Sequence, residues 1–144
     1  MVPSTAIGTS IDVESFINEY FGAWQGTDAD IIMSYYAENV VIQVPGLHLE
    51  GKTAVREQFV LPFITGFPGN RHIPQNMVFG QGVVVVEWSF EAEHRGTFAG
   101  VPATGAHVRV PGCSVYEYDS ATRQITAGRI YFDAGTLLKQ IGPT

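Results

Sequence analysis

Apolar residues in the first part of the chain recur at the spacing of an α-helix. One helical stripe over residues 13–24 is formed by Val13, Phe16, Ile17, Tyr20 and Trp24. Ser10 can cap this helix, and Gly26 can end it. The pattern then predicts a second short helix through Tyr36, a short strand in "NVVIQVPG", and a third helix through Phe63 that Pro62 bends or ends.

From residue 71 onward the period of the pattern changes to two, which is typical of β-strands. One strand is followed by a tight turn at Gly80–Gly82 and by a long strand from Val83 into Phe98. The segments "AHVRVPGCSVYEY" and "ITAGRIYFD" predict two further strands, and "AGTLLKQIG" predicts a short C-terminal helix. This order is an α+β pattern in one domain, residues 1–144. We expect N-terminal helices packed on a curved antiparallel sheet, a cone that encloses an apolar pocket.

The charge of the chain argues against polyanionic partners. Its 144 residues carry eight Lys and Arg against 14 Asp and Glu, a formal net charge of −6. The cations are scattered singly, so the grouped positive charge that nucleic acid or an anionic membrane surface requires is missing. The longest apolar stretches are too short to cross a bilayer, and the N-terminal segment lacks the pattern of a signal peptide. Because a single cysteine, Cys113, excludes an intrachain disulfide, we expect a cytoplasmic protein.

Several motifs for cofactors and nucleophiles are missing from the sequence. There is no GxGxxG after a strand, no GxxxxGK[ST] and no HExxH, so nucleotide-cofactor and zinc-peptidase chemistry lack support. The four histidines are widely spaced, and no spacing suggests a metal site. No nucleophile-elbow sequence surrounds a serine, and Cys113 on a predicted strand is typical of a buried, inert thiol.

One carboxylate stands at the end of the last predicted strand. In "RIYFD", Arg129, Tyr131 and Asp133 share one face, while Ile130 and Phe132 share the other. The first face lies either in solvent or along a cavity. Asp is a preferred N-cap, and "DAGTLLKQ" is typical of a capped helix start. The local sequence therefore favours a helix cap over catalysis, although the two roles can coexist.

Other polar and aromatic residues also have two interpretations. His94 ends the aromatic face of the long strand and is either a hydrogen-bonded structural histidine, which the local sequence favours, or a polar group of the pocket. Glu117, flanked by two tyrosines, is more typical of a surface strand residue than of a buried acid. Aromatic residues make up 12% of the chain, and those such as Tyr35 and Trp88 line a ligand cavity or form ordinary core.

The second half carries a longer pattern. It is a Trp, then His-x-Gly-x-Phe-x-Gly-[Ile/Val]-Pro-x-Thr-Gly, then a last strand that ends in Asp before Leu-Leu-x-Gln-[Leu/Ile]-Gly. The matching residues are Trp88, His94, Gly96, Phe98, Gly100, Val101, Pro102, Thr104, Gly105, Asp133, Leu137, Leu138, Gln140 and Gly142. This pattern resembles the SnoaL-like polyketide cyclase (ester cyclase) family of the NTF2-like superfamily. Upstream, "DADIIMSYYAENVVIQVPG" and "GKTAVREQF" also look like this family, so the resemblance spans nearly the whole chain.

The resemblance implies roles for the polar residues. Asp133 becomes the general acid/base of an intramolecular aldol ring closure, with helix capping as a second duty. His94 is the second candidate catalytic residue, a hydrogen-bond donor for the enolate oxygen. A carboxylate beside Tyr131, Phe132 and Trp88 would lose solvation, which would raise its pKa toward a useful range.

The candidate substrate-binding residues are Trp88, Tyr131, Arg129, Glu117 and Tyr35. The chain has Arg129 where many members carry Trp. Glu117 stands near the place where a His or Gln often accompanies the Asp. These departures imply a pocket adapted to another substrate.

These features predict a cofactor-independent cyclase or isomerase, a homodimer, that acts on a bulky, mostly apolar, carbonyl-containing secondary metabolite of polyketide or terpenoid type. Neither a metal nor an organic cofactor is required. An NTF2-like dehydratase or epoxide hydrolase is one alternative. Arg129 and Asp133 on one strand face fit the hydrolase's Asp–Arg–Asp constellation, but no second Asp is evident. The other alternative is a non-catalytic ligand-binding or interaction module, since fold does not prove function.

Overall fold

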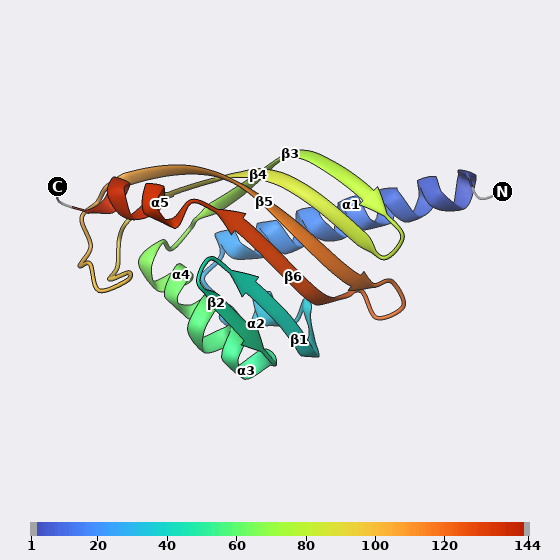
Figure 1. The fold of residues 1–144 in the computed structure, drawn as a ribbon, viewed down its shortest axis with the longest axis horizontal. Coiled ribbons are helices and arrows are strands. Elements are labelled where there is room, and N and C mark those ends of the chain that lie inside the picture. The colour runs from blue at the N-terminus through green and yellow to red at the C-terminus, as the bar shows by residue number, and fades with distance from the viewer. Residues whose placement is uncertain (1–2, 143–144) are drawn as a thin grey trace.

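The structure, a computed structural model, describes residues 3–142, with side chains from Asp12 onward. Its helices are α1 (Pro3–Gln25), α2 (Ala29–Met33), α3 (Lys52–Val55), the π-helical η1 (Arg56–Val60), α4 (Leu61–Gly66) and α5 (Ala134–Ile141). Its strands are β1 (Tyr36–Val44), β2 (Leu47–Glu50), β3 (Arg71–Gly80), β4 (Val83–Glu93), β5 (His107–Asp119) and β6 (Gln124–Phe132). Helices packed on a curved sheet confirm the predicted α+β class (Figure 1).

Six strands form one sheet in the order β2-β1-β6-β5-β4-β3. Strands β3 to β6 succeed one another as an antiparallel meander, as predicted. Strand β1 differs, because it pairs antiparallel with β2 but parallel with β6. The chain enters β1 from the helices and leaves it through β2, so β1 joins the edge of β6 without being its hairpin partner. The sheet is therefore mixed at this one pairing.

Three predicted boundaries are wrong. The short helix predicted to run through Tyr36 ends at Met33, and Tyr36 is the first residue of β1. Helix α1 begins at Pro3, so Ser10 lies inside the helix and does not cap it. The strand predicted to reach Phe98 ends at Glu93. At His94 the backbone turns instead into a closed loop, because the His94 N–H donates to the Ala106 carbonyl at 2.8 Å and the Gly105 N–H donates to the His94 carbonyl at 2.8 Å.

Pro62 neither ends nor breaks the helix that contains it. The segments α3, η1 and α4 adjoin without a gap from Lys52 to Gly66, and the π-helical turn lies just before Pro62. Proline has no N–H to donate to the preceding turn, and a wider turn accommodates it. Phe59 and Phe63, four residues apart, consequently face the same way. The Phe63 ring meets the Phe90 ring of β4 edge to face at a centroid distance of 5.9 Å.

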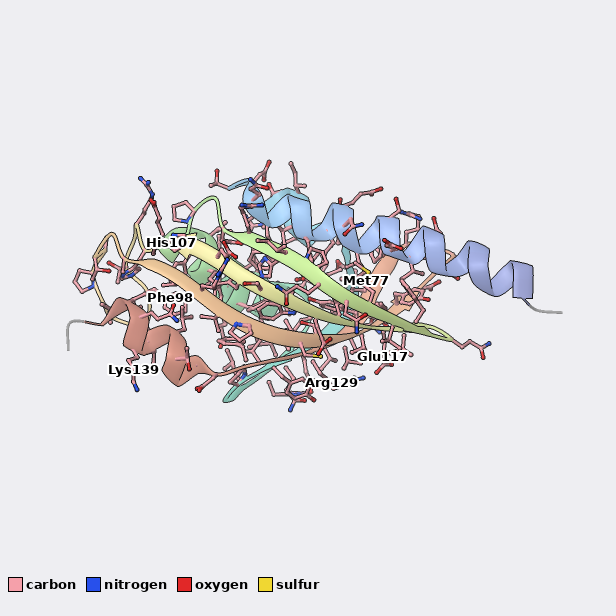
Figure 2. All side chains as sticks on the ribbon, turned by 90° about the horizontal axis from the view of Figure 1, so that it is seen from above. Met77, Phe98, His107, Glu117, Arg129 and Lys139 are labelled. Atoms are coloured by element: carbon pink, nitrogen blue, oxygen red, sulfur yellow. The ribbon has the colours of Figure 1, made fainter. Side chains whose placement is uncertain are left out.

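The core lies between the helices and the inner face of the sheet. Helix α1 runs beside β3 in both views (Figures 1 and 2) and contributes the predicted stripe, whose members are all buried. Helix α5 and the loop between β4 and β5 lie together at the opposite end from the start of α1 (Figure 1). Among the described residues, no helix combines the length and the hydropathy that a membrane span requires.

Gly112 of β5 makes room for the largest side chain of the inner face. A Cβ atom at this position would lie 2.2 Å from Cη2 of Trp88 on β4, which is far inside van der Waals contact. The two residues are direct neighbours across the strands. The Trp88 indole therefore lies over the Gly112 backbone, where any larger residue would displace it.

We expect Gly112→Ala to destabilise the protein by about 1–3 kcal/mol, because the new methyl group overlaps the Trp88 ring. The free energy of unfolding in urea measures this. Gly22→Ala is the matched control, since a Cβ there meets nothing within 4 Å and helix propensity favours alanine by about 0.5–1 kcal/mol. Equal stability of the two variants would contradict the proposed overlap.

Candidate active-site cavity

A mostly aromatic cavity lies between the helices and the sheet. It is small, about 30 Å³, which is room for one or two water molecules. Its walls come from α1, η1, α4, α5 and the inner face of β3 to β6. The lining residues are Tyr20, Trp24, Phe59, Phe63, His72, Trp88, Phe90, Val110, Ser114, Tyr116, Ile130, Phe132 and Leu137. None of them is an acid, a lysine or an arginine, so the chemistry of the cavity depends on His72 and the hydroxyl groups.

His72 on β3 is the basic group of this cavity. Its imidazole contacts four aromatic rings at centroid distances of 5.2–5.5 Å, those of Phe21, Trp24, Trp88 and Phe90. Burial among these rings lowers the pKa of His72 to about 3, so the imidazole is neutral at pH 7. Its Nδ1 atom is enclosed and has no hydrogen-bond partner among the described residues. A buried nitrogen without a partner is unfavourable, and a ligand oxygen could satisfy it.

Three buried tyrosines supply hydroxyl groups at the α1 side of the cavity. The Tyr20 and Tyr36 hydroxyls form a short hydrogen bond, and the Tyr20 and Tyr116 rings meet edge to face at 5.6 Å. Burial raises the pKa of all three well above the ordinary value. The nearby Tyr36 adds to this rise for Tyr20, and the nearby Tyr20 adds to it for Tyr116. The hydroxyls therefore stay protonated. Tyr20 and Tyr116, which line the cavity, can donate hydrogen bonds there.

Trp88 and Ser114 form a fixed polar contact in the cavity wall. The indole N–H of Trp88 donates to the Ser114 Oγ atom at 2.9 Å, and both residues are buried. This bond holds the indole plane over Gly112. The predicted contact of Trp88 with substrate stays a prediction, and the structure places this residue in the cavity. Among the described side chains, no three His, Cys, Asp or Glu residues gather as a metal site would require.

Asp133 lies outside the cavity, at the start of α5. Its carboxylate accepts hydrogen bonds from Gly135 N at 3.0 Å, Thr136 N at 3.3 Å and Thr136 Oγ1 at 2.9 Å. These bonds, that of the Thr136 side chain first, lower the pKa of the exposed Asp133 carboxylate. The expected rise in its pKa through lost solvation is wrong, because the carboxylate remains in water. The capping role is confirmed, whereas the catalytic role stays a prediction.

The other residues of the predicted strand face point away from the cavity. Tyr131 is 53% exposed, while its neighbours Ile130 and Phe132 line the cavity. Arg129 donates to the Glu117 carboxylate at 2.7 Å across β5 and β6, in the region that Figure 2 labels. Strand alternation separates the two faces, so the structure brings Arg129 and Glu117 together outside the cavity and leaves Tyr131 on the same outer face.

His94 is completely buried but does not line the cavity. Its Nδ1 atom accepts the Thr104 N–H at 3.2 Å and lies 2.9 Å from the Thr104 hydroxyl. Because a backbone N–H only donates, Nδ1 carries the lone pair and Nε2 carries the proton. His94 thus holds the loop of residues 94–106 closed. The Tyr35 ring lies 5.7 Å from the Tyr20 ring, and Tyr35 does not line the cavity either.

Little in the sequence indicated the importance of His72. It lies in "NRHIPQNMVFG", where the alternation of polar and apolar residues is poor and the pairing register shifts between Pro74 and Asn76. One signal was available, because Trp88 and Phe90 mark the inner face of β4 and His72 pairs with Phe90. That pairing requires the register, which the sequence did not supply.

Most of the chain matches a known protein family. The model of the SnoaL-like domain matches residues 17–127, more than half of the chain. The chain belongs to the SnoaL-like family. The match ends before Asp133, so it covers all of β3 to β5 but not the capped helix. No curated protein matches significantly.

Solved structures share the fold of this SnoaL-like chain. A protein named as a SnoaL-like polyketide cyclase from Shewanella putrefaciens CN-32 has a TM-score of 0.78 at 16% identity, with 97% of this chain and 94% of that chain covered. Another of that name, from Jannaschia sp. CCS1, has a TM-score of 0.77 at 20% identity, with 90% and 92% covered. A Catenulispora acidiphila protein with a ketosteroid isomerase-like fold, in complex with trimethylamine, has a TM-score of 0.72 at 14% identity, with 90% and 93% covered. The NTF2-like fold is thereby confirmed.

Burial of His72 makes the stability of the folded protein depend on pH. Its pKa is about 3 when folded and about 6.5 when unfolded, so between these values the unfolded state binds a proton that the folded state does not. We expect the free energy of unfolding to fall as the pH decreases from about 6.5 toward about 3, and His72→Phe to weaken this dependence. Urea unfolding at several pH values measures it, with the exposed His48→Phe as control. An unchanged pH profile in His72→Phe would contradict the burial.

Capping by Asp133 predicts a second, more acidic transition. Because the folded pKa is lowered, the stabilisation is present above the ordinary value of about 3.8 and is lost as the pH falls through the folded pKa. We expect Asp133→Ala to lower the thermal unfolding midpoint at pH 7, while Asp133→Asn retains most of the cap. Equal midpoints for Asp133→Ala and the native protein at pH 7 would contradict the capping role.

Proposed function

We propose that this chain is a cyclase or isomerase that binds a mostly apolar carbonyl compound in the aromatic cavity and acts by proton transfer between side chains and substrate. One observation carries the proposal. The neutral His72 imidazole lines a cavity that is otherwise aromatic and aliphatic with a few hydroxyls, and its buried Nδ1 atom has no hydrogen-bond partner among the described residues. An apolar pocket with a few convergent polar groups is the usual form of a small-molecule site.

The walls of the cavity favour a ring-containing substrate. Trp24, Phe59 and Phe63 on the helices face Trp88 and Phe90 on the sheet, so a flat or alicyclic body would contact aromatic surface on both sides. A cavity of about 30 Å³ is much smaller than the bulky substrate that the sequence predicts. Binding therefore requires these walls to move apart.

The polar groups suit a carbonyl oxygen. Isomerisation or aldol closure removes a proton from the carbon next to a carbonyl, and negative charge develops on the oxygen. Neutral His72, if Nδ1 carries its proton, and the protonated Tyr20 and Tyr116 hydroxyls are donors that can stabilise this oxygen. Such a donor in a water-poor site is worth about a hundred- to a thousand-fold in rate.

Asp133 is the candidate proton acceptor in this proposal. Support comes from its position, since it lies directly after Phe132 and begins α5, and both Phe132 and Leu137 of α5 line the cavity. Its present bonds to Gly135 and Thr136 occupy the carboxylate. Proton transfer by Asp133 therefore requires α5 to move, or the carboxylate to leave its capping position.

A non-catalytic ligand-binding module is the second candidate. The observation that favours it is the composition of the cavity wall, in which no Asp or Glu is found among the described residues. Such a module would bind the same apolar compounds through the same rings and would leave their protons in place. The two candidates therefore differ in turnover and not in binding.

Exchange of α-protons in deuterium oxide tests the proposal. Cyclohexanone is a simple probe, and proton NMR monitors its deuteration. We expect the protein to accelerate exchange and His72→Phe to reduce the acceleration about a hundredfold or more. If Asp133 is the base, Asp133→Asn loses about a hundred- to ten-thousand-fold. His48→Phe, at an exposed histidine outside the cavity, is the matched control.

The outcomes separate the candidates. Binding of cyclohexanone without any acceleration of exchange supports the ligand-binding module. Full activity of folded Asp133→Asn removes Asp133 from the mechanism. Full activity of folded His72→Phe contradicts the role proposed for the His72 imidazole.

A further inference from the structure

A surface cleft lies along the seam between α1 and the first half of β3. It has a volume of about 200 Å³. The lining residues are Asn18, Phe21, Gly22, Gln25, Arg71, His72, Ile73 and Pro74. The cleft is thus polar at its rim and contains one residue, His72, that also lines the aromatic cavity.

Two local features of the sequence open this cleft. Asn18, Gly22 and Gln25 recur at helical spacing on one face of α1, and Gly22 in the middle has no side chain. A Cβ atom built on Gly22 would meet nothing within 4 Å, so the space above it is empty. On the other side, β3 is an edge strand whose pairing with β4 shifts register between Pro74 and Asn76. An edge strand tolerates both the proline and the irregularity.

The His72 ring stands between the cleft and the cavity. It packs against Phe21, which lines only the cleft, at 5.3 Å, and against Trp88, which lines only the cavity, at 5.5 Å. His72 thus lines both spaces, and its imidazole forms part of the wall between them. Because its Nδ1 atom has no hydrogen bond among the described residues, no polar contact of that atom opposes rotation of the ring.

We propose that the cleft between α1 and β3 is the entrance to the cavity, that His72 is its gate, and that the missing side chain at Gly22 sets the size of what enters. Displacement of the imidazole joins a space of about 30 Å³ to one of about 200 Å³. A substrate larger than the cavity would then extend into the cleft, beside the polar groups of Asn18, Gln25 and Arg71. The inference rests on the proposed function only in taking the cavity as the site.

On the α5 side of the cavity, two hydrogen bonds fix the helix to the sheet. The Gln140 side chain accepts the Arg109 N–H at 2.8 Å and donates to the Arg109 carbonyl at 3.0 Å. This pair of bonds ties α5 to the backbone of β5, and Leu137 of the same helix covers the cavity. If molecules entered the cavity past α5, loss of the Gln140–Arg109 hydrogen bonds would make entry easier.

Collisional quenching of tryptophan fluorescence by acrylamide measures access without any need for affinity or turnover. The chain has two tryptophans, Trp24 and Trp88, and both line the cavity. We expect Gly22→Leu to lower the quenching constant about threefold or more, because its side chain fills the cleft. We expect His72→Ala to raise it, because the gate is removed, and the double variant to return toward the native value.

Gly22→Ala and Gln140→Ala are the controls, and urea unfolding confirms that each variant is folded. The small alanine methyl should leave quenching unchanged, and so should the loosened α5. Unchanged quenching in folded Gly22→Leu would overturn the proposal, as would an increase found only in Gln140→Ala. Because the experiment measures access alone, loss of α-proton exchange with intact gating would refute the proposed function and leave the entrance standing.

Discussion

The position of Tyr20 of α1 among the aromatic residues of the sheet is the contact on which the rest of the structure depends. Its ring meets those of Tyr36 on β1 and Tyr116 on β5, each edge to face at 5.6 Å. Its hydroxyl bonds to that of Tyr36, so neither polar group is buried without a partner. This one side chain therefore ties α1 to two strands that are not neighbours in the sheet.

The same packing creates the cavity. Aromatic rings held edge to face keep their shape and do not collapse into the space between them. Trp88 stays flat over Gly112 because its N–H is bonded to Ser114 and because glycine leaves room for the ring. A cavity in this fold is thus the consequence of large, rigid side chains on both layers. His72, which is enclosed by four of these rings, is neutral for the same reason.

The structure confirms one of the two expectations for Asp133. The residue caps α5, whereas its catalytic role stays a prediction. Its bonds to Gly135 and Thr136 satisfy N–H groups that every helix start leaves free. The family to which the chain belongs shares the fold, and the fold alone does not assign a reaction. In this structure His72, Tyr20 and Tyr116 line the cavity, whereas Asp133 stands one residue beyond Phe132 of its wall.

The sequence by itself determined most of the elements, although it did not indicate β2 or the start of β1 at Tyr36. Helical spacing located the buried stripe of α1, alternation located the meander of β3 to β6, and the Asp that precedes a helix was identified as its cap. The tight turn at Gly80–Gly82 was also correct, because such signals are local in the chain. Strand alternation even separated Ile130 and Phe132 from Tyr131, although it left open which face lines a cavity.

Only the tertiary structure decided which residues meet. Sequence alone could not reveal that β1 runs parallel to β6 or that Arg129 pairs with Glu117 outside the cavity. It also could not reveal that His94 holds its own loop closed by accepting the Thr104 N–H. The sequence did not identify His72, because the surroundings of its imidazole are formed by rings of α1 and β4 that lie far from it in sequence. Periodicity reports which side of an element is apolar, but register and packing set its neighbours, and a pKa depends on those neighbours.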